Sequence, residues 1–397
     1  MMDNGAEDGR SGEDARTLLC ALVAIPSVNP AFQSDGDEAA LFGERAKASY
    51  VATWLAEAGF TPETPEVLPD RPNVTARLRG TSGRRRLVLE CHLDTVQATG
   101  MPQPFRPLLR EGRIFGRGAV DDGGCIAAMM LAMRALKLDP PSADIIFLAA
   151  IDEEYEARGV AHFLAQGEHF DGGIAGEPTS LRIVTASKGC VRWHIDVLGR
   201  AAHSSAPERG VDAIVGAMDL LAHFHAELLP RVTSRRHPLA GAAALTCTMV
   251  QGGQGVNTIA ERCRLSFDRR VLPGESSRAV WEEAVAAADT FAAARTDGLR
   301  VVCHPPFIDA PAMDVPSDAP AVSAMGTVCR AEGRSPVPLG VGFGSDASRM
   351  TAAGVPTIVF GPGDIAQAHA AEEFVAVADV VLAARMIEQV ARRFGEN

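Results

Sequence analysis

The sequence predicts an α/β protein in which a mixed, mostly parallel sheet is flanked by helices and carries a smaller inserted domain. Short apolar runs rich in β-branched residues alternate with longer helical patterns, and this alternation is typical of α/β sheets. The order of elements changes between about residues 187 and 305 and then returns to the first type, which indicates an insertion. With 397 residues, 47% of them hydrophobic, the chain is long enough for two or three domains.

The larger domain begins with a helical pattern over residues 44–58. Val51, Trp54 and Leu55 fall on one face of this helix, and Gly59 follows as a C-cap. Residues 123–138 are apolar on nearly every side, which predicts a largely buried helix. Four further apolar runs predict buried strands, at residues 86–91, 144–151, 173–175 and 357–360.

The inserted domain shows a β-α-β-β-α-β order, which is the split βαβ or ferredoxin-like arrangement. Its expected strands are residues 191–198, 243–251, 263–271 and 299–303, and its expected helices are residues 211–229 and 275–294. We therefore divide the chain into a first part of the larger domain at residues 14–186, the inserted domain at 187–305 and a second part of the larger domain at 306–397, with a disordered polar tail at 1–13.

The composition argues against several classes of protein. The 38 basic and 50 acidic side chains give a net charge of −12, which argues against a nucleic-acid-binding surface. The most apolar stretches fall short of the roughly 18–20 residues that a membrane span needs, so we expect no membrane partner. The first residues show neither the basic nor the apolar region of a targeting signal. The eight cysteines are scattered without a CxxC pair, a pattern of free thiols that predicts the cytoplasm.

Five acidic or histidine sites follow the predicted strands or lie in the loops between them. Ligands collect at the carboxyl ends of strands in open α/β sheets. In an extended segment residues i and i+2 point the same way, so Asp94 can hydrogen-bond the ring of His92 and fix its tautomer. The five sites are His92 with Asp94, Asp121 in GRGAVDDGG, Asp152-Glu153-Glu154, Glu177 in GEPT, and His369 at the end of GPGDIAQAH.

Each of these motifs also has a purely structural interpretation when it is taken alone. Asp121 and Asp122 fit an Asp-Gly turn that caps the next helix. Glu153 and Glu154 fit acidic side chains at a helix N-terminus, where the helix dipole favours them. A dinucleotide-binding interpretation of GRGAVDD fails, because the third glycine of that fingerprint is missing and no strand leads into it.

Taken together, the sites favour a metal centre. Two histidines and three carboxylates make a nitrogen and oxygen ligand set that suits zinc, or manganese or cobalt. One carboxylate can bridge two ions, which leaves one histidine and one terminal carboxylate for each. A second glutamate beside a ligand would be free to act as a base. No cysteine falls into this set, which argues against a structural zinc site.

The motifs HLDTV, GRGAVDD, DEE, GEPT, AHSS, GGQGVNTI, DRRVLPG and GPGDIAQAH stand in this order along the chain. In this combination the sequence resembles the dinuclear zinc amidohydrolases, a family that includes acetylornithine deacetylase, succinyl-diaminopimelate desuccinylase, aminoacylase and the glutamate carboxypeptidases. The resemblance extends from about residue 16 to residue 393, and the motifs look most like those of acetylornithine deacetylases. It implies two zinc ions per subunit, with cobalt or manganese as substitutes.

The resemblance also implies a role for each site residue. It makes Asp94 the residue that orients His92, and Glu153 the general acid and base of the reaction. Two positions depart from the family pattern, since Gly123 stands where a lysine is usual and Cys91 where a glycine is usual. The implied ligands are His92 and Glu177 for one zinc, Glu154 and His369 for the other, and Asp121 as the bridge.

The inserted domain resembles the family's lid, which also mediates dimerisation. His203 matches a histidine that reaches the partner subunit's active site and stabilises the oxyanion. Asn257 and Arg270 match groups that hold the substrate's amide and carboxylate, and the loop with Ser345 matches one that lines the pocket. Two alternatives stay open: His203 as a cap before the lid helix, and Arg270 in a salt bridge to Asp268 or Glu275.

The function that the resemblance implies is hydrolysis of the amide bond of an N-acyl-L-amino acid, with N-acetyl as the expected acyl group. Attack by a hydroxide between the two zinc ions would release a carboxylate and a free amino acid. The expected partners are this small molecule, or a dipeptide, and a second copy of the chain. A metallo-carboxypeptidase, a dipeptidase and a desuccinylase-like enzyme remain alternatives. A non-catalytic scaffold would show lost ligands, whereas all five ligands and the base are present.

Overall fold

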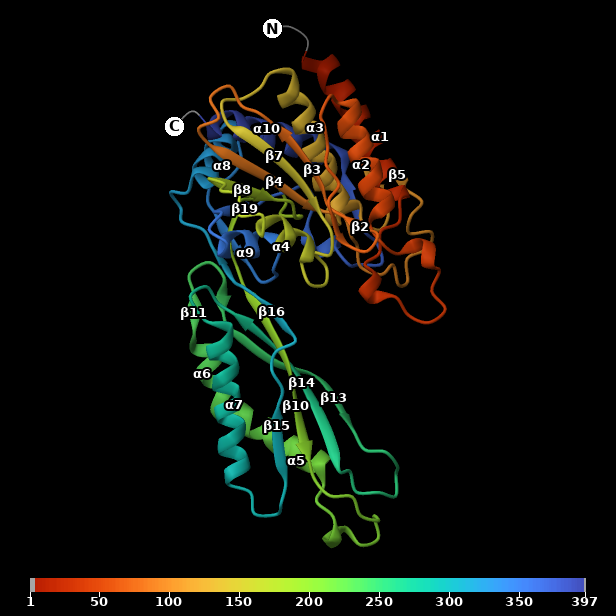
Figure 1. Cartoon of the computed structure of the whole chain (residues 1–397), viewed down its shortest axis with the longest axis vertical. Helices are drawn as coiled ribbons and strands as arrows, with labels where there is room; N and C mark the ends of the chain where they lie inside the picture. The colour runs from red at the N-terminus through yellow and green to blue at the C-terminus, as the bar shows by residue number, and fades with distance from the viewer. Residues whose placement is uncertain (1–3, 396–397) are drawn as a thin grey trace. The chain divides into compact units, whose positions relative to one another are not determined.

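The computed structural model describes residues 4–395, and these divide into two compact units. The first unit contains the described residues up to Thr185, Val315–Leu339 and the described residues from Ser345 on. The second unit contains Ala186–Asp314 and Gly340–Gly344. Figure 1 shows the helices and strands of both units.

The first unit is built around a mixed sheet. Strands β7, β4, β8 and β19 are neighbours in this order and run parallel, while β3 pairs antiparallel with β7 at one side. The carboxyl ends of the four parallel strands therefore meet at one edge of the sheet, as the sequence predicted. The strands are β3 (Val74–Leu78), β4 (Arg86–His92), β7 (Asp144–Ala150), β8 (Gly172–Ala175), β9 (Val184–Ser187) and β19 (Thr357–Val359).

Helices flank this sheet, which confirms the predicted fold class (Figure 1). One layer contains α3 and α10, which pack on each other, and α3 contacts β3, β4 and β7. The other contains α4 and α9, where Phe163 of α4 and Met350 of α9 join Val88 and Leu148 in one apolar cluster. The helices of the first unit are α1 (Asn4–Ala24), α2 (Arg45–Glu57), α3 (Gly124–Leu138), α4 (Arg158–Leu164), α8 (Pro320–Ala331), α9 (Asp346–Ala352) and α10 (Val377–Phe394).

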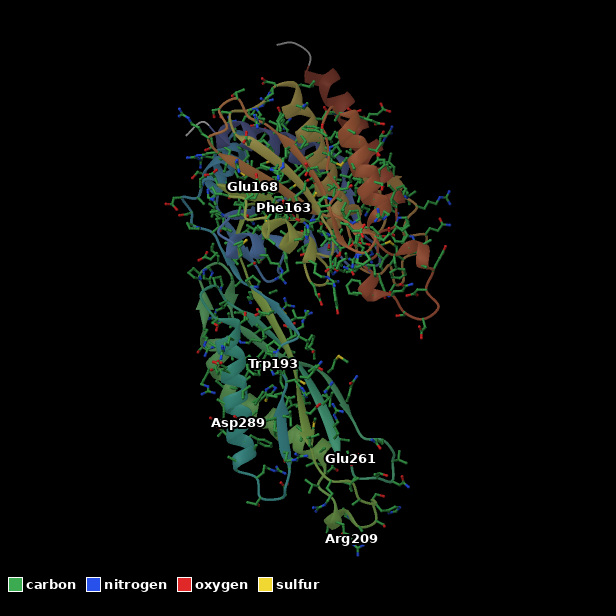
Figure 2. The ribbon with its side chains drawn as sticks, viewed as in Figure 1. Phe163, Glu168, Trp193, Arg209, Glu261 and Asp289 are labelled. Atoms are coloured by element: carbon green, nitrogen blue, oxygen red, sulfur yellow. The ribbon has the colours of Figure 1, made fainter. Side chains whose placement is uncertain are left out.

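The second unit contains a five-stranded antiparallel sheet, in which β13-β14-β10-β15 are neighbours in this order and β16 also pairs with β10. This is the strand order of a split βαβ unit. Trp193, labelled in Figure 2, stacks on Phe267 in its core with ring centroids 5.6 Å apart. The elements are β10 (Gly189–Leu198), α5 (Ala213–His223), α6 (Leu229–Ser234), β13 (Ala244–Gly252), β14 (Arg262–Val271), α7 (Ser277–Ala293), β15 (Arg300–Cys303) and β16 (Ile308–Ala310).

Short elements complete both units. A three-stranded sheet in the order β20-β6-β5 lies in the first unit. The short strands are β1 (Glu66–Leu68), β2 (Arg71–Pro72), β5 (Leu108–Arg110), β6 (Arg113–Phe115), β11 (Arg236–His237), β12 (Gly241–Ala242), β17 (Met313–Asp314), β18 (Leu339–Val341) and β20 (Phe374–Ala376).

Within the described residues, no helix combines the length and the apolar character that crossing a membrane requires.

Two features differ from the expectation. The predicted tail at residues 1–13 is helical from Asn4 on, and residues 1–3 lie outside the described part. Leu18 and Leu22 bury the apolar side of α1, and no proline stands before them to stop the helix. The second unit also extends to Asp314, beyond the expected end at residue 305, because β16 still pairs with β10.

Candidate metal centre

The sequence-predicted ligands meet at the carboxyl edge of the first unit's sheet. His92 is the last residue of β4, Glu153 and Glu154 follow β7, and Glu177 follows β8. Because β7, β4 and β8 are parallel neighbours, their ends deliver these side chains to one place. The local pattern explains the placement: the strands are buried on both faces and mostly apolar, with Glu90 as a buried acidic side chain inside β4, and the predicted site residues stand at or beyond the strand ends.

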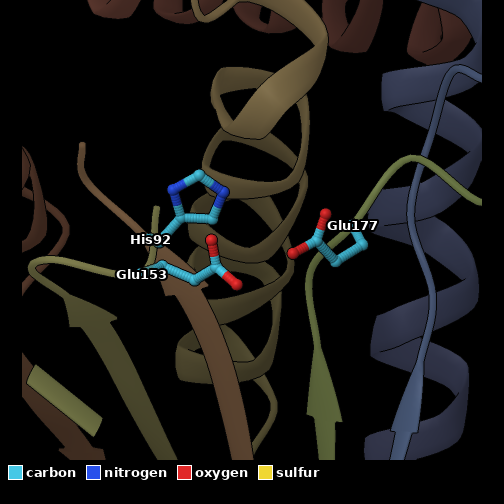
Figure 3. Close-up of side chains that lie close together, drawn as sticks. All are labelled: His92, Glu153 and Glu177. Atoms are coloured by element: carbon cyan, nitrogen blue, oxygen red, sulfur yellow. The ribbon is translucent and has the colours of Figure 1, made fainter. Parts of the chain in front are cut away.

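His92, Glu153 and Glu177 form one group of possible metal ligands. Each offers one atom, and these atoms all lie within 4.8 Å of one another. Figure 3 shows the carboxylates of Glu153 and Glu177 close to the His92 ring, each side chain coming from the end of a different strand. His92 and Glu177 are buried, and Glu153 is half-buried.

Asp121, Glu154 and His369 form a second group with the same spacing. His369 Nε2 lies 3.0 Å from Asp121 Oδ2 and 3.0 Å from Glu154 Oε1. The other oxygen of Asp121, Oδ1, lies 2.8 Å from Nε2 of His92 in the first group. Asp121 thus directs one carboxylate oxygen to a histidine of each group, which is the arrangement expected of a bridging ligand.

A tight turn before α3 positions Asp121. Gly118 begins this turn with φ +77°, in the left-handed region that glycine adopts without strain. Glu373 Oε1 accepts hydrogen bonds from the backbone N–H groups of Val120 at 3.0 Å and Asp121 at 3.2 Å. A Cβ added at Gly123 would lie 2.3 Å from the carbonyl oxygen of Gly118, so this turn leaves no room for a side chain at position 123.

Asp94 organises both the histidine and the acidic pair. His92 Nδ1 donates to the backbone carbonyl of Asp94 at 3.0 Å. The carboxylate oxygen Oδ1 of Asp94 lies farther from the same nitrogen, at 3.5 Å. The hydrogen bond to the carbonyl leaves Nε2 of His92 to face Asp121. The Asp94 carboxylate accepts instead from the backbone N–H groups of Glu153 and Glu154, both at 3.1 Å. Asn29 Nδ2 adds a third hydrogen bond at 2.7 Å.

Asp152 shapes the loop that carries Glu153 and Glu154. Its φ of +70° is unusual for a residue other than glycine, and it turns the chain directly after β7. Its buried carboxylate is held by Arg158 Nε at 2.6 Å and by Arg71 Nη2 at 3.0 Å. Asn29 Nδ2 also donates to Asp152 at 3.0 Å, so one amide connects the carboxylates of Asp152 and Asp94.

The structural alternatives for the acidic motifs do not match the geometry. The helix that follows Glu153 and Glu154 is α4, which begins only at Arg158. At the start of α3 the N-cap residue is Gly123, and no side chain caps the helix there. The acidic residues therefore point to each other and to the two histidines, and not to a helix terminus.

Burial and mutual proximity shift the pKa values of the site. Burial raises the pKa of Glu153 well above its ordinary value and that of Glu154 to about 7. Burial also acts to raise the pKa of Asp121, but hydrogen bonds with His369 and His92 outweigh it and hold that pKa below its usual range. Hydrogen bonds to Asp121 and Glu154 raise the pKa of His369 to about 10.

These shifts describe buried carboxylates that need a positive partner. Divalent cations would supply that positive charge, and they require the ligands to be deprotonated. Imidazole nitrogens and carboxylate oxygens are donors that zinc, cobalt and manganese accept. The donor set therefore fits two metal ions that share Asp121.

The structure brings His203 and Asn257 together in the second unit. The backbone of His203 forms an isolated antiparallel β-bridge with that of Thr258. The backbone N–H of Ser204 donates to the carbonyl of Asn257 at 2.9 Å. Both side chains are exposed. His203 Nδ1 lies 2.7 Å from Ser205 Oγ, so its other ring nitrogen is directed elsewhere. His203 does not cap the following long helix, because Asp212 is the N-cap of α5.

Arg270 lies near the opposite end of β14 from these residues. In the register of the sheet it stands opposite Cys190, whereas Arg262, beside the Asn257 loop, stands opposite Leu198. Eight residues of strand separate the two positions, or about 26 Å at ~3.3 Å per residue. Arg270 Nε forms an ion pair with Asp268 Oδ1 at 2.9 Å, which is one of the contacts expected as an alternative to substrate binding.

Ser345 belongs to the first unit, where it is the N-cap residue of α9 and is buried. Its side chain makes no capping hydrogen bond to that helix. The neighbouring Asp346 is also buried, and burial raises its pKa to about 7.

Sequence reasoning did not assign a role to Asn29, Asp152 or Glu373. Asn29 lies 65 residues before Asp94, and Glu373 lies 252 residues after Asp121. No spacing rule connects positions so far apart. The available signal was chemical: Glu373 follows His369 closely in the sequence, and Asp152 begins the acidic triplet.

The fold and the site together define a metallohydrolase, with an α/β sheet whose strand ends carry two ligand groups joined by one carboxylate. The chain belongs to peptidase family M20/M25/M40, whose sequence profile matches residues 88–393. Acetylornithine deacetylase from Edwardsiella ictaluri is 30% identical over 387 residues, which cover 95% of this chain and 97% of that protein. The enzyme of the same name from Vibrio atlanticus is 31% identical over 330 residues, covering 82% of this chain and 85% of that protein.

Solved structures share the fold at lower identity. A tripeptidase from Staphylococcus aureus superposes with a TM-score of 0.79 at 18% identity, covering 97% of this chain and 99% of that chain. Human carnosine dipeptidase 1 gives a TM-score of 0.77 at 16% identity, with 98% of each chain covered. A dinuclear metal-binding peptidase of the M20 family from Bacillus subtilis gives 0.70 at 16% identity, covering 97% of this chain and 98% of that chain.

Proposed function

We propose that this chain is a dizinc enzyme that hydrolyses the amide bond of an N-acyl-L-amino acid and releases a carboxylate and a free amino acid. The observation that carries the proposal is the pair of ligand groups joined by Asp121. The family supports metal-dependent amide hydrolysis. The acetylornithine deacetylases that match nearly the whole chain support an N-acetyl amino acid as substrate.

The residues would share the two ions as follows. His92 and Glu177 would hold one, Glu154 and His369 the other, and Asp121 both. Bound zinc would polarise the amide carbonyl and lower the pKa of a water molecule from about 15.7 towards about 7. Cobalt and manganese accept the same donors, so we expect them to substitute.

Glu153 is the general acid and base in this proposal. It lies within the first ligand group, but its carboxylate is not among the five ligands assigned to the two ions. Asp94 fixes its backbone, and burial raises the pKa of its carboxyl group. The ionised carboxylate is therefore a stronger base towards the proton of the attacking water. The same carboxyl group would then deliver that proton to the leaving amine nitrogen.

The second unit would act as a lid and as a dimer interface. His203 would donate to the developing oxyanion, where loss of one donor typically costs about 10²–10³ in rate. Asn257 and Arg270 would hold the amide and the carboxylate of the substrate, with Ser345 at the pocket wall. Because about 26 Å of strand separates the two ends of β14, His203 and Arg270 of one copy cannot both reach one small substrate. A shared site would therefore need a second copy of the chain.

The compartment is a further part of the proposal. All eight cysteines are free, and five of them are buried, as expected for a protein of the reducing cytoplasm.

The test is amine release from N-acetyl-L-ornithine alongside a panel of other N-acyl amino acids, N-succinyl compounds and dipeptides. Zinc-loaded and chelator-stripped protein are compared on each substrate. We expect metal-dependent release that is highest on an N-acetyl amino acid. Metal-dependent release that is highest on dipeptides would replace the substrate class and keep the site. No release on any substrate by protein with two bound zinc ions would contradict the proposed reaction and favour a non-catalytic role.

A further inference from the structure

A buried lysine lies behind the metal centre and has no role in the proposed reaction. Lys47 is one of only three lysines in a chain with 38 basic residues, and only 2% of it is exposed. It projects from α2 into a region where Asp94, Glu373, Asp122 and Glu44 act on its charge. Among the described residues it forms no direct ion pair with any of them.

The ammonium group of Lys47 lies beside Gly118, in the turn that carries the bridging ligand. A Cβ added to Gly118 would lie 3.7 Å from Lys47 Nζ and 3.8 Å from the carbonyl oxygen of Asp121, which are ordinary contact distances. The same Cβ would lie 2.8 Å from Thr95 Cγ2, so the Thr95 methyl group is what excludes a side chain at position 118. Burial of a positive charge is costly in free energy unless carboxylates compensate for it. A buried lysine at this position therefore depends on the acidic side chains around it.

Three of the surrounding carboxylates hold backbone groups of the metal ligands. Asp94 accepts from the N–H of Glu154, Asp122 Oδ2 accepts from the N–H of His92 at 3.1 Å, and Glu373 accepts from the N–H of Asp121. Each of these three ligands is thus fixed by a buried acid, and these acids repel one another. Arg117 offsets part of this charge through its ion pair with Glu373 at 2.5 Å.

We propose that Lys47 is a positioning residue of the metal centre, whose charge holds the three carboxylates behind the site together so that their ligands keep the geometry for binding metal. The inference rests on the proposed two-metal function. Position 123 of the same turn cannot accept a side chain. The positive charge comes from Lys47 on α2.

Two interpretations of Lys47 predict opposite effects on metal affinity. If Lys47 were only a nearby positive charge, it would repel divalent cations, and its removal would tighten metal binding. If it positions the ligands, its removal would let the carboxylates move apart and weaken metal binding. Loss of a residue that orients metal ligands typically costs about 10–100-fold in metal affinity.

The experiment measures the zinc stoichiometry and dissociation constants of the full chain by competition with a chromophoric chelator. Lys47→Met removes the charge and keeps the length of the side chain. Lys137→Met, at an exposed position on α3, is the matched control. We expect two zinc ions in the wild type, about 10–100-fold weaker binding of at least one of them in Lys47→Met, and unchanged binding in the control. Equal or tighter binding in Lys47→Met would overturn the inference.

A second measurement keeps Lys47 in place and so does not depend on whether Lys47→Met folds. Lysine labelled with ¹³C at Cε gives three signals in the wild type, because the chain has three lysines. Lys137→Arg and Lys188→Arg assign the other two. Zinc is expected to shift the Lys47 signal and leave that of Lys137 in place; a Lys47 signal that zinc does not move would overturn the inference. A wild type that binds no zinc would contradict the proposed function itself.

Discussion

At the scale of single residues, two adjacent glutamates belong to different groups of possible metal ligands. Glu153 joins His92 and Glu177, whereas Glu154 joins Asp121 and His369. One carboxylate, Asp94, fixes the backbone N–H of both at 3.1 Å. A change of either glutamate should therefore affect a different function, Glu153 the chemistry and Glu154 the metal.

Glu153→Ala and Glu153→Gln are expected to keep both zinc ions and to lose nearly all turnover, because no other group stands ready to move the proton between water and amine. The measurement combines zinc content with amine release under saturating substrate. A variant that keeps two zinc ions and more than about a tenth of the wild-type rate would contradict the role of Glu153, since general acid–base catalysis contributes about 10²–10⁴-fold. Loss of one zinc ion would instead make Glu153 a ligand.

Asp94→Asn is expected to weaken zinc binding by about 10–100-fold, because the amide offers one acceptor oxygen where the carboxylate accepts three hydrogen bonds through two. Asp139→Asn, which changes an exposed aspartate after α3, serves as the control. Zinc affinity from chelator competition is the measurement. Equal affinities in Asp94→Asn and the wild type would show that Asp94 does not organise the ligands.

The sequence was informative about residues that follow strands and much less so about the residues that support them. His92, Glu153 and Glu177 could be predicted because each lies at the end of a buried strand or within three residues of it. The parallel order of these strands then brings the three side chains together. Asn29 and Glu373 could not, because their contacts join loops that are distant along the chain. Arg270 was left open between two roles, and its ion pair with Asp268 is now visible.

At the scale of elements, one buried aspartate connects three strands of the second unit. Asp196 of β10 accepts from Arg264 Nε of β14 at 2.7 Å and from Arg262 Nη2 at 2.8 Å. His304, directly after β15, lies 2.8 Å away through Nε2. These hydrogen bonds, first among them that from Arg264, hold the pKa of Asp196 below its usual range.

Asp196→Asn is expected to lower the free energy of unfolding at pH 7 by about 1–3 kcal/mol, since a neutral amide replaces the buried charged acceptor of these hydrogen bonds. The pKa of Asp196 is lower in the folded than in the unfolded chain, where it is about 3.9. Its stabilisation is therefore complete above that value and is lost as the pH falls through the folded pKa.

Urea unfolding of the second unit, followed by the fluorescence of Trp193 and Trp281, measures this difference at pH 7 and near pH 3. The exposed Asp297→Asn is the control. A difference between Asp196→Asn and the wild type that grows towards low pH would contradict the account.

Element types could be predicted more reliably than element ends. The strand expected at residues 86–91 is β4, and its run of hydrophobic residues was the signal that predicted it. The helix expected at residues 211–229 begins at Ala213 as α5 and continues through a π-helical turn at Phe224–Leu228 into α6. Pro230 lacks the N–H that a regular α-helix would use there, which is consistent with a π-helical turn just before it. Apolar periodicity runs through this turn and so could not reveal it.

At the scale of the whole molecule, the residues assigned to one reaction are divided between two units. The metal ligands lie in the first unit, and His203, Asn257 and Arg270 lie in the second. His203 and Arg270 are at opposite ends of one sheet. The order of these motifs along the sequence does not indicate that His203 and Arg270 are far apart. The register of β10 and β14 shows it.

Mixing two inactive variants, His203→Ala and Glu153→Ala, is expected to restore part of the activity after subunit exchange. A mixed dimer would combine an intact Glu153 from one copy with an intact His203 from the other. Amine release before and after exchange is the measurement, and two copies of the same variant are the control. Exchange that is complete, as shown by mass-tagged chains, without any recovery would exclude a site shared between copies.

The central claim is that Asp121 joins two metal ions, and anomalous diffraction from crystals of the zinc-loaded protein tests it most directly. The account predicts two zinc peaks in the first unit, one beside His92 and Glu177 and the other beside Glu154 and His369, with Asp121 between them. A single peak, or zinc bound away from Asp121, would contradict it.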